Sequence, residues 1–543
     1  MRNSFCRVPV PRSSSRSDQR VAVLADSDTR WKWGALTARR LAPAAPAPTG
    51  YVLRGRATPT ARQLGEAGVG EADAGPVEVT CAEFLAELGR RHYDVVVLAL
   101  VGGAVQAVLH GVRARWPDPA ARPVLVTGYV GVVYEKLADG LLLRHGADLV
   151  LANSRHDAAR FRAVYEGAGA DPAAVVETAL PFLEGAAYEG AGDRAHRVVF
   201  AVQPSVPEGR ADRAYLLERA ARHARLHPGR EVLVKLRSRP GEHTTHLEEH
   251  PYQRLAERLP GGLPPNCRLV YGNMGEVLDG TDLLVTVSST AALESLHRGI
   301  PTAVLTDLGI REALGNHHFL GSGCLASWDQ LDGGLLPAGD PDWLTAHGVA
   351  PAAPAASAAP GTPAAPGPRA ASATPVAPAA PGPRAASAAP GPRAASAAPG
   401  TPPAPGPGAA SAAPAAPPAP STAGPPYAAA APAGAVSGQP AAGPPAADPY
   451  AAARARVARL LAADRLPPVA PYYTLATAPG YLPGILARHR LAPDGTPLPG
   501  ARAAGESSGA RRWLRAHLRE AARGAYRHGV QRVAPVIRRL GEL

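Results

Sequence analysis

Lysine is almost absent from this 543-residue chain. Only Lys32, Lys136 and Lys235 occur, although lysine and arginine together number 57. Aromatic residues are also scarce, at 5%, whereas glycine and proline number 57 and 60. A bias towards alanine, arginine and proline is typical of a GC-rich genome and says little about function. It does make each of the three lysines a candidate for a specific role.

Cysteine and long apolar runs are scarce as well. The four cysteines, Cys6, Cys81, Cys267 and Cys324, show no C-x-x-C spacing, which argues against a disulfide framework or a zinc knuckle and suits a reducing compartment. The first 20 residues contain no apolar run of signal-peptide length. Outside an Ala/Pro-rich segment, no uncharged apolar stretch reaches about 18 residues, so we expect no transmembrane helix and a cytoplasmic location.

The net charge of +12 suggests a nucleic-acid partner at first sight. Half of this net charge lies in residues 505–543, which contain nine arginines and three glutamates. Because the rest is close to balanced, we expect no nucleic-acid binding by the body of the protein. Apolar residues recur near helical spacing in this tail, which predicts a basic amphipathic helix in peripheral contact with an anionic membrane, or else a solvated or partner-binding tail.

One long segment is built almost entirely of alanine, proline, glycine and serine. It covers residues 348–448 and contains the octapeptide PGPRAASA three times, beginning at Pro366, Pro381 and Pro390. Such a composition has too little apolar bulk to offset the entropy of ordering, so it predicts a disordered linker. The chain then divides into six predicted parts, at residues 1–19, 20–182, 183–347, 348–448, 449–498 and 499–543.

Residues 20–182 and 183–347 each alternate short apolar runs with stretches of helical spacing. The runs are nearly continuous, which is the pattern of parallel strands covered on both faces. They lie at residues 21–26, 94–100, 123–128 and 148–154, and again at 197–203, 231–237, 267–272, 282–289 and 302–307. The predicted fold class is therefore α/β, with two tandem doubly wound Rossmann-like domains.

The second domain carries the richer candidate site. In VTVSSTAALESLHRGIPTAVLTD, a strand ends in Ser288, Ser289 and Thr290, and Glu294 lies one turn along the next helix. Hydroxyl and backbone N–H groups at a helix N-terminus attract phosphate, and a carboxylate can accept hydrogen bonds from ribose hydroxyls. The plain alternative is that Ser289 caps the helix and Glu294 is an exposed carboxylate.

A neighbouring strand end adds positive charge. Lys235, Arg237 and Arg239 follow the run EVLV, where core packing requires no cation, whereas a diphosphate does. Gln203 ends a further strand of the same domain. The alternative for Lys235 is a surface lysine whose stem lies along apolar neighbours.

The first domain offers candidates for a general base. Asp26 and Asp28 follow its first strand, and His156 follows a later one. Any of the three could take the proton of an acceptor hydroxyl, with Asp28 preferred. The aspartates could instead cap the following turn, or form the Asp-x-Asp of a metal-dependent transferase or phosphatase. A separate remote alternative is a zinc hydrolase that uses His246, Glu249 and His250.

The order of motifs in the second domain resembles the donor half of GT-B glycosyltransferases. One strand ends in Lys-x-Arg and another in Ser-Ser-Thr, and the next helix carries Glu and is followed by Gly-Ile-Pro. The closest resemblance is to the capsule-polysaccharide and CDP-glycerol glycerophosphotransferase branch. Taken whole, residues 21–328 and 450–489 resemble actinobacterial proteins described as glycosyltransferases of uncharacterised function. The Gly-rich donor loop of many other GT-B enzymes is absent.

This resemblance implies a metal-independent transferase whose substrate is a nucleotide-activated sugar and whose acceptor is unknown, with no further cofactor. It implies that Lys235 and Arg237 neutralise the donor pyrophosphate, that residues 288–290 hold it, and that Glu294 binds the ribose. It also implies that residues 449–498 return to the first domain. A sugar-nucleotide epimerase or a non-catalytic nucleotide-sugar-binding protein stays open as an alternative.

Overall fold

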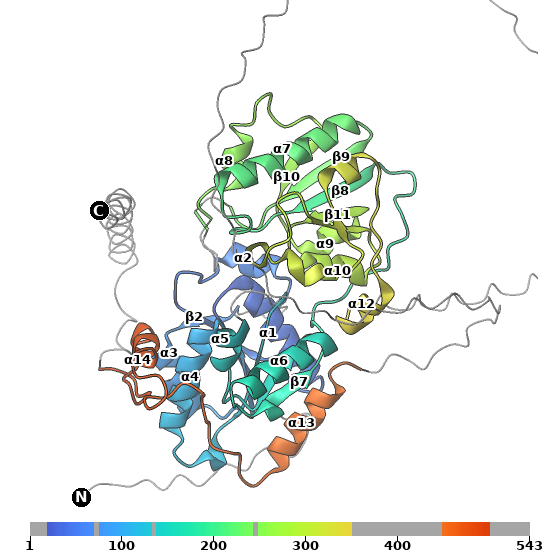
Figure 1. The fold of residues 1–543 in the computed structure, drawn as a ribbon. Helices are drawn as coiled ribbons and strands as arrows, with labels where there is room; N and C mark the ends of the chain where they lie inside the picture. Colours follow the sequence, from blue (N-terminus) through green and yellow to red (C-terminus); the bar gives the residue numbers. More distant parts are fainter. Residues whose placement is uncertain are drawn as a thin grey trace, which may run out of the picture. The chain divides into compact units, whose positions relative to one another are not determined.

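The fold was analysed in a computed structural model, which describes residues 19–69, 75–132, 137–239, 241–242, 248–349 and 448–499. Nearly all of the predicted N-terminus, linker and basic tail lies outside these residues, as do Lys136 and His246. Two parallel sheets with helices packed on them make up the described structure, as predicted (Figure 1). In the described part of the chain, no helix combines the length and the apolar character needed to cross a membrane.

The first domain is built on a seven-stranded sheet in the order β3-β2-β1-β4-β5-β6-β7. Every neighbouring pair is parallel. Its strands are β1 (Val21–Ala25), β2 (Thr49–Leu53), β3 (Val77–Val79), β4 (Val95–Ala99), β5 (Val124–Gly128), β6 (Leu149–Ala152) and β7 (Val175–Glu177). Its α-helices are α1 (Asp28–Leu41), α2 (Ala61–Glu66), α3 (Cys81–Arg90), α4 (Gly102–Arg115), α5 (Leu137–Leu142) and α6 (Arg155–Gly167).

The second domain has a six-stranded parallel sheet in the order β10-β9-β8-β11-β12-β13. Its strands are β8 (His196–Ala201), β9 (Arg230–Lys235), β10 (Cys267–Val270), β11 (Leu283–Thr286), β12 (Thr302–Leu305) and β13 (Leu325–Ala326). Its α-helices are α7 (Arg210–Leu226), α8 (Tyr252–Ala256), α9 (Met274–Asp279), α10 (Ala291–His297), α11 (Trp328–Asp332) and α12 (Pro341–Ala346).

The apolar runs became buried strands for the predicted reason. All residues of β1, β4, β5 and β6 are buried, because helices cover both faces of the first sheet. Polar residues at the strand ends then begin the helices. The side chain of Ser27 accepts a hydrogen bond from the N–H of Arg30, and Thr80 forms a capping box with Glu83.

The strand order reverses once in each sheet, and this places the ligand crevices. The reversal lies between β1 and β4 in the first sheet and between β8 and β11 in the second. In open parallel sheets, ligands bind outside the carboxyl ends of the strands at such a reversal. The loops after β8 and β11, which contain Gln203 and residues 288–290, are therefore the place to look for a donor site.

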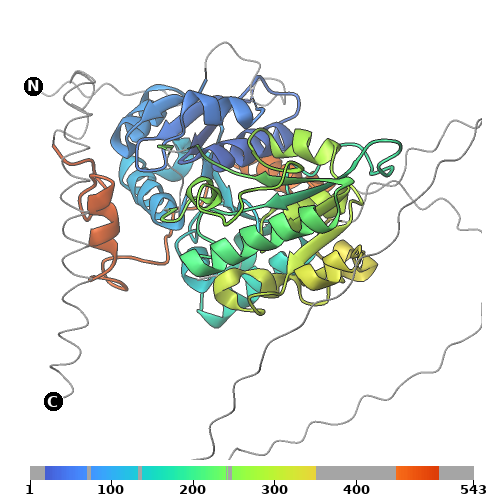
Figure 2. The same cartoon turned by 90° about the horizontal axis from the view of Figure 1, so that it is seen from above.

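The C-terminal segment, residues 448–499, packs on the first domain. Helix α13 (Ala451–Ala462) lies against α1, β5 and β7, and α14 (Leu482–Arg488) lies against α4. Figure 1 shows both helices, in orange and red, beside the first domain, and Figure 2 shows the red helix beside the blue part of the same domain. Tyr450 donates a hydrogen bond to the carbonyl of Ala179, and Arg122 donates one to the carbonyl of Pro467.

The packed structure extends into both ends of the predicted linker. Val349 is fully buried, and Gly348 adopts a φ of +66° close to the carbonyl of Asn153. Asp448 accepts a hydrogen bond from the N–H of Tyr450 and forms an ion pair with Arg454. Residues 348, 349 and 448 therefore belong to the folded domains, which corrects the prediction that the linker covers them.

Candidate functional site

A cleft of about 300 Å³ lies between the two domains at the strand reversal of the second sheet. The first domain lines the cleft with the start of α1, with one side and the end of α2, and with Val132 and Phe182. The second domain lines it with the loops after β8, β9, β10 and β11. All seven predicted donor-site residues line it: Gln203, Lys235, Arg237, Ser288, Ser289, Thr290 and Glu294. Of the three candidate bases, only Asp28 does.

The three hydroxyl residues after β11 have different surroundings. Ser288 is buried, its hydroxyl donates to the carbonyl of Leu314 at 2.6 Å, and its N–H donates to Oε1 of Gln203 at 3.1 Å. The hydroxyl of Thr290 accepts a hydrogen bond from the N–H of Val132 in the first domain at 3.4 Å. Ser289 is half-buried, and in the described part of the chain its O–H has no acceptor.

These contacts change the expected roles of the three residues. Gln203 and Ser288 hold the shape of the loop, and Ser289 is the hydroxyl best placed for a ligand. The helix that follows, α10, has only seven residues. A helix this short has a weak dipole, and the role predicted for its N-terminus in anion binding stays a prediction.

Gly131 explains how the first domain comes so close to this loop. A Cβ atom at Gly131 would lie 2.1 Å from the hydroxyl oxygen of Thr290. No side chain fits at that distance, so the contact requires glycine. The close approach brings the backbone of the first domain to one wall of the cleft.

Lys235 is the most unusual cation in the cleft. Its side chain is buried, with 6% of the residue exposed, and burial lowers the pKa of Lys235 to about 8. Its ammonium donates to the carbonyl of Leu236 at 2.8 Å, and it forms no ion pair with any described residue. A buried charge without a counter-charge is costly, which makes Lys235 the cation of the cleft that packing explains least. The alternative of a surface lysine is not supported.

Arg237 and Asp28 contact each other across the cleft. Nη2 of Arg237 lies 2.7 Å from Oδ1 of Asp28 and 2.5 Å from the hydroxyl of Thr29. Burial would raise the pKa of Asp28, but the charge and hydrogen bond of Arg237 hold this pKa below its ordinary value. Arg237, which was predicted to bind the donor phosphate, and Asp28, the predicted base, therefore form an ion pair with each other in this structure.

Glu294 has a partner that the sequence could not reveal. Oε2 of Glu294 lies 3.8 Å from the ammonium of Lys32, which also lies over the ring of Phe182. Glu294 is buried, and burial raises the pKa of its carboxyl group above the ordinary value, while Lys32 opposes this shift. Glu294 is thus not the exposed carboxylate of the alternative reading. The scarcity of lysine was the one sequence signal for Lys32.

Asp26 does not line the cleft. Its Oδ1 accepts from the guanidinium of Arg30 at 2.9 Å, and its Oδ2 accepts from the N–H of Val101 at the start of α4 at 2.9 Å. Asp26 thus holds α1 and the start of α4 together within the first domain, and it is not placed to act as a general base at the cleft. Because Asp26 and Asp28 pair with different arginines, the structure does not support an Asp-x-Asp metal site either.

His156 also lies elsewhere. Its ring stacks on the ring of His347, with centroids 4.3 Å apart, and lies near His318. Burial lowers the pKa of His156, and lowers the pKa of His347 to about 4. The prediction that His156 supplies the base at the cleft is therefore wrong in this structure, because its ring is committed to an aromatic cluster.

The remote zinc-hydrolase alternative gains no support. His246 lies outside the described residues, whereas Glu249 and His250 line a separate surface hollow. Three arginines, Arg210, Arg254 and Arg258, line the same hollow. Such a positive surrounding disfavours a divalent cation.

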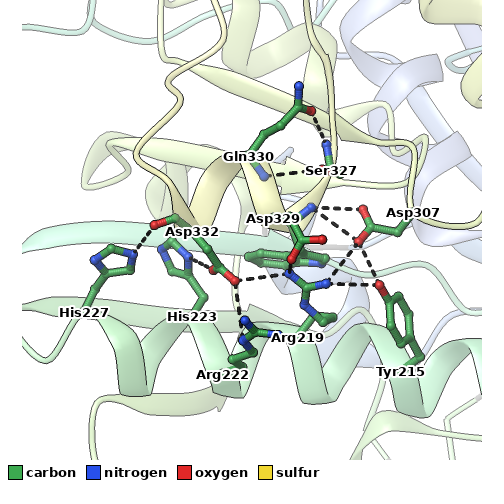
Figure 3. A network of polar contacts seen from close by, with 11 residues as sticks. Tyr215, Arg219, Arg222, His223, His227, Asp307, Ser327, Asp329, Gln330 and Asp332 are labelled. Atoms are coloured by element: carbon green, nitrogen blue, oxygen red, sulfur yellow. Dashed lines mark hydrogen bonds and ion pairs between the residues drawn. The ribbon is translucent and has the colours of Figure 1, made fainter.

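Among the described residues, one group has side chains close enough to hold a metal ion: His223, His227 and Asp332. Figure 3 shows Arg219 and Arg222 beside Asp332, with which both form ion pairs. His223 shares a hydrogen bond with Asp332 at 2.8 Å through Nδ1, and its Nε2 lies 3.1 Å from the guanidinium of Arg230. Arg219 binds the other oxygen of Asp332 at 3.1 Å.

The hydrogen bonds of this group identify it as structural. Arg230 can only donate, so Nε2 of His223 accepts that hydrogen bond. The protonated Nδ1 then donates a hydrogen bond to Asp332. Neither ring nitrogen is then free to bind a metal. Burial lowers the pKa of His223 to about 4, which is consistent with a neutral ring. The group joins α7 to α11.

Comparisons with known proteins were made for the whole chain. No curated protein matches. Solved structures with similarity include UDP-GlcNAc 2-epimerase from Methanocaldococcus jannaschii (10% identity, 60% of this chain and 98% of that chain, TM-score 0.39) and the glycotransferase of kitacinnamycin (14%, 63% and 96%, 0.36). A third is Anabaena Alr3699/HepE in complex with UDP and glucose (14%, 58% and 88%, 0.37).

One protein family covers most of the folded part of the chain. The family model described as "Putative glycosyltransferase (DUF6716)" matches residues 21–360, which is more than half of the 543 residues. Its match begins at the first residue of β1 and includes every residue that lines the cleft. The chain therefore belongs to the DUF6716 family and is a GT-B glycosyltransferase-like protein.

Proposed function

We propose that the protein transfers a sugar from a nucleotide-activated donor to an acceptor hydroxyl, and that the donor binds in the cleft between the domains. The observation that carries this proposal is the buried ammonium of Lys235, which faces the cleft without an ion pair among the described residues. The family description and the position of the cleft at a strand reversal support it.

In this proposal the second domain holds the donor. Lys235 and Arg237 neutralise the diphosphate, and the hydroxyl of Ser289 donates to one of its oxygens. Glu294 accepts hydrogen bonds from the ribose hydroxyls, with Lys32 beside it. Because three cationic side chains line the cleft, we propose that they do the work of a metal ion, and we expect transfer to persist in EDTA.

Asp28 is the proposed general base, since it is the one of the three predicted bases that lines the cleft. It takes the proton of the acceptor hydroxyl as the acceptor oxygen bonds to the anomeric carbon. The bond between that carbon and the phosphate oxygen breaks, and the nucleoside diphosphate leaves with the electron pair. The acceptor is proposed to approach from the first domain. A role in surface-glycan or secondary-metabolite synthesis, near the capsule-polysaccharide and CDP-glycerol branch, is the finer form of this proposal.

Nucleotide binding tests the donor site directly. The protein would be screened against nucleoside diphosphates and their sugars by thermal shift, with affinities then measured by calorimetry. We expect Lys235→Ala combined with Ser289→Ala to weaken binding about tenfold or more, which corresponds to about 1.4 kcal/mol. Arg254→Ala, which removes an exposed arginine outside the cleft, is the matched control. Unchanged affinity in a folded double variant would contradict the assignment.

The product distinguishes the transferase from the open alternatives. A transferase moves the sugar to an acceptor and releases the nucleoside diphosphate. An epimerase returns an altered sugar nucleotide without an acceptor, and a binding protein returns the donor unchanged. Product analysis by mass spectrometry and NMR separates these three results.

A further inference from the structure

Arg237 and Asp28 form an ion pair, although the proposed function gives Arg237 to the sugar donor and Asp28 to the acceptor. Arg237, from the strand end of β9, and Asp28, from the start of α1, form an ion pair of 2.7 Å between the two domains. The exposed fractions of their side chains are 32% and 17%. By contrast, the ion pair of Arg122 with Asp148 inside the first domain is buried, at 1% and 3%. The cleft pair is thus open to ligand and solvent, as an exchangeable contact must be.

A carboxylate and a phosphate bind a guanidinium in the same way. Both present oxygens that accept charge-assisted N–H hydrogen bonds, so they compete for one arginine. Lys235 lines the same cleft and has no carboxylate partner among the described residues. Of the two cations of the proposed phosphate site, only Arg237 is therefore ion-paired to a side chain of the first domain among the described residues.

We propose that Asp28 takes the place of a donor phosphate on Arg237 while the cleft is empty, and that donor binding moves Arg237 to the phosphate and frees Asp28 for the acceptor. This inference rests on the proposed function. It makes the base available only after the donor is in place, so the donor binds before a productive acceptor. A hydroxyl cannot readily give its proton to a carboxylate that a guanidinium already holds.

Thr29 completes the contact on the first domain. Its hydroxyl oxygen accepts from the same Nη2 of Arg237 at 2.5 Å. Arg237 thus donates hydrogen bonds to two adjacent residues of α1, and the phosphate of the bound sugar nucleotide must replace both contacts. Thr29 can be changed without altering the base itself, which gives an independent test.

The test is the binding of UDP, with ADP, GDP and CDP in parallel, measured by calorimetry on the full chain. If Asp28 competes with the phosphate, Asp28→Asn tightens binding of the preferred nucleotide about fivefold, although it lowers sugar transfer by about a hundredfold or more. Thr29→Val tightens binding by a smaller factor. In the Arg237→Ala background, Asp28→Asn no longer changes the affinity, because the competition is gone.

Glu184→Gln is the matched control. It removes a carboxylate from an ion pair with Arg40 outside the cleft and should leave the affinity unchanged. The inference is overturned if folded Asp28→Asn and Thr29→Val proteins bind the nucleotide no more tightly than the wild type while Lys235→Ala still weakens binding. That result leaves the donor site itself intact. If the wild type binds none of the four nucleotides, the donor site and this inference both fall.

Discussion

At the scale of single residues, the charge of Lys235 should set the pH range of nucleotide binding. Burial lowers its pKa to about 8, so the free protein loses this charge as the pH rises through 8. Since the anion binds the charged form, each further pH unit should weaken binding about tenfold, or about 1.4 kcal/mol. Calorimetry from pH 7 to 9 measures the change. Lys235→Arg stays charged and should show no such loss; a parallel loss in that variant would assign the titration to another group.

Glu294 yields a second prediction at this scale, which the structure leaves open. If its buried carboxylate accepts hydrogen bonds from ribose hydroxyls, Glu294→Ala should weaken UDP binding about tenfold more than 2′-deoxy-UDP binding. The ratio of the two dissociation constants is the measurement. Equal losses for both nucleotides would mean that Glu294 serves only to hold Lys32, 3.8 Å away. A melting curve checks that the variant is folded, because Lys32 loses its partner.

At the scale of elements, the C-terminal segment should carry part of the stability of the first domain. Leu486 of α14 is fully buried beside α4, whereas Leu498 near the end of the segment is 40% exposed. Leu486→Ala should lower the free energy of unfolding by about 2–5 kcal/mol, because it leaves a cavity in a packed core. Leu498→Ala should change it by less than about 0.5 kcal/mol. Denaturant unfolding measures both, and equal values would show that α14 does not pack as described.

At the scale of the whole molecule, residues 351–446 should be dispensable. We expect their replacement by a Gly/Ser linker of about 30 residues to leave melting temperature and nucleotide affinity unchanged, because the entropy of loop closure varies only with the logarithm of length and changes by about 1 kcal/mol. The matched control extends the replacement to residue 348. It removes Val349, which is fully buried, and should lower the melting temperature. A large loss of stability in the shorter replacement would show that the segment is structural.

The basic tail, residues 500–543, gives the last prediction at this scale. Ten arginines among apolar residues at near-helical spacing favour an anionic membrane surface. We expect the full chain to sediment with anionic liposomes at low salt and to be released at high salt. A chain that ends at Pro499 is the control and should stay in solution. Absence of sedimentation at low salt, or equal sedimentation of both chains, would contradict a membrane role.

The sequence determined the fold class, and it predicted residues with which the second domain lines the cleft. Continuous apolar runs such as residues 21–26 and 94–100 can be buried only as strands covered on both faces, and polar residues at strand ends reach a ligand crevice wherever the sheets pack. Lys235, Arg237 and residues 288–290 were found in this way. Strands β2, β3, β7 and β13 were missed. The last three have only two or three residues, which carry no recognisable pattern, and β2 (TGYVL) has only three apolar residues in a row.

Only the tertiary structure decided how the charges pair. Asp28 and Asp26 look alike in the sequence, yet one faces Arg237 of the other domain and the other binds Arg30 and Val101. Lys32 meets Glu294 more than 200 residues along the chain, and the ring of His156 stacks on that of His347 instead of facing the cleft. Strand and helix patterns depend on neighbours within a few residues, whereas ion pairs depend on how two domains approach, and no local pattern records that approach.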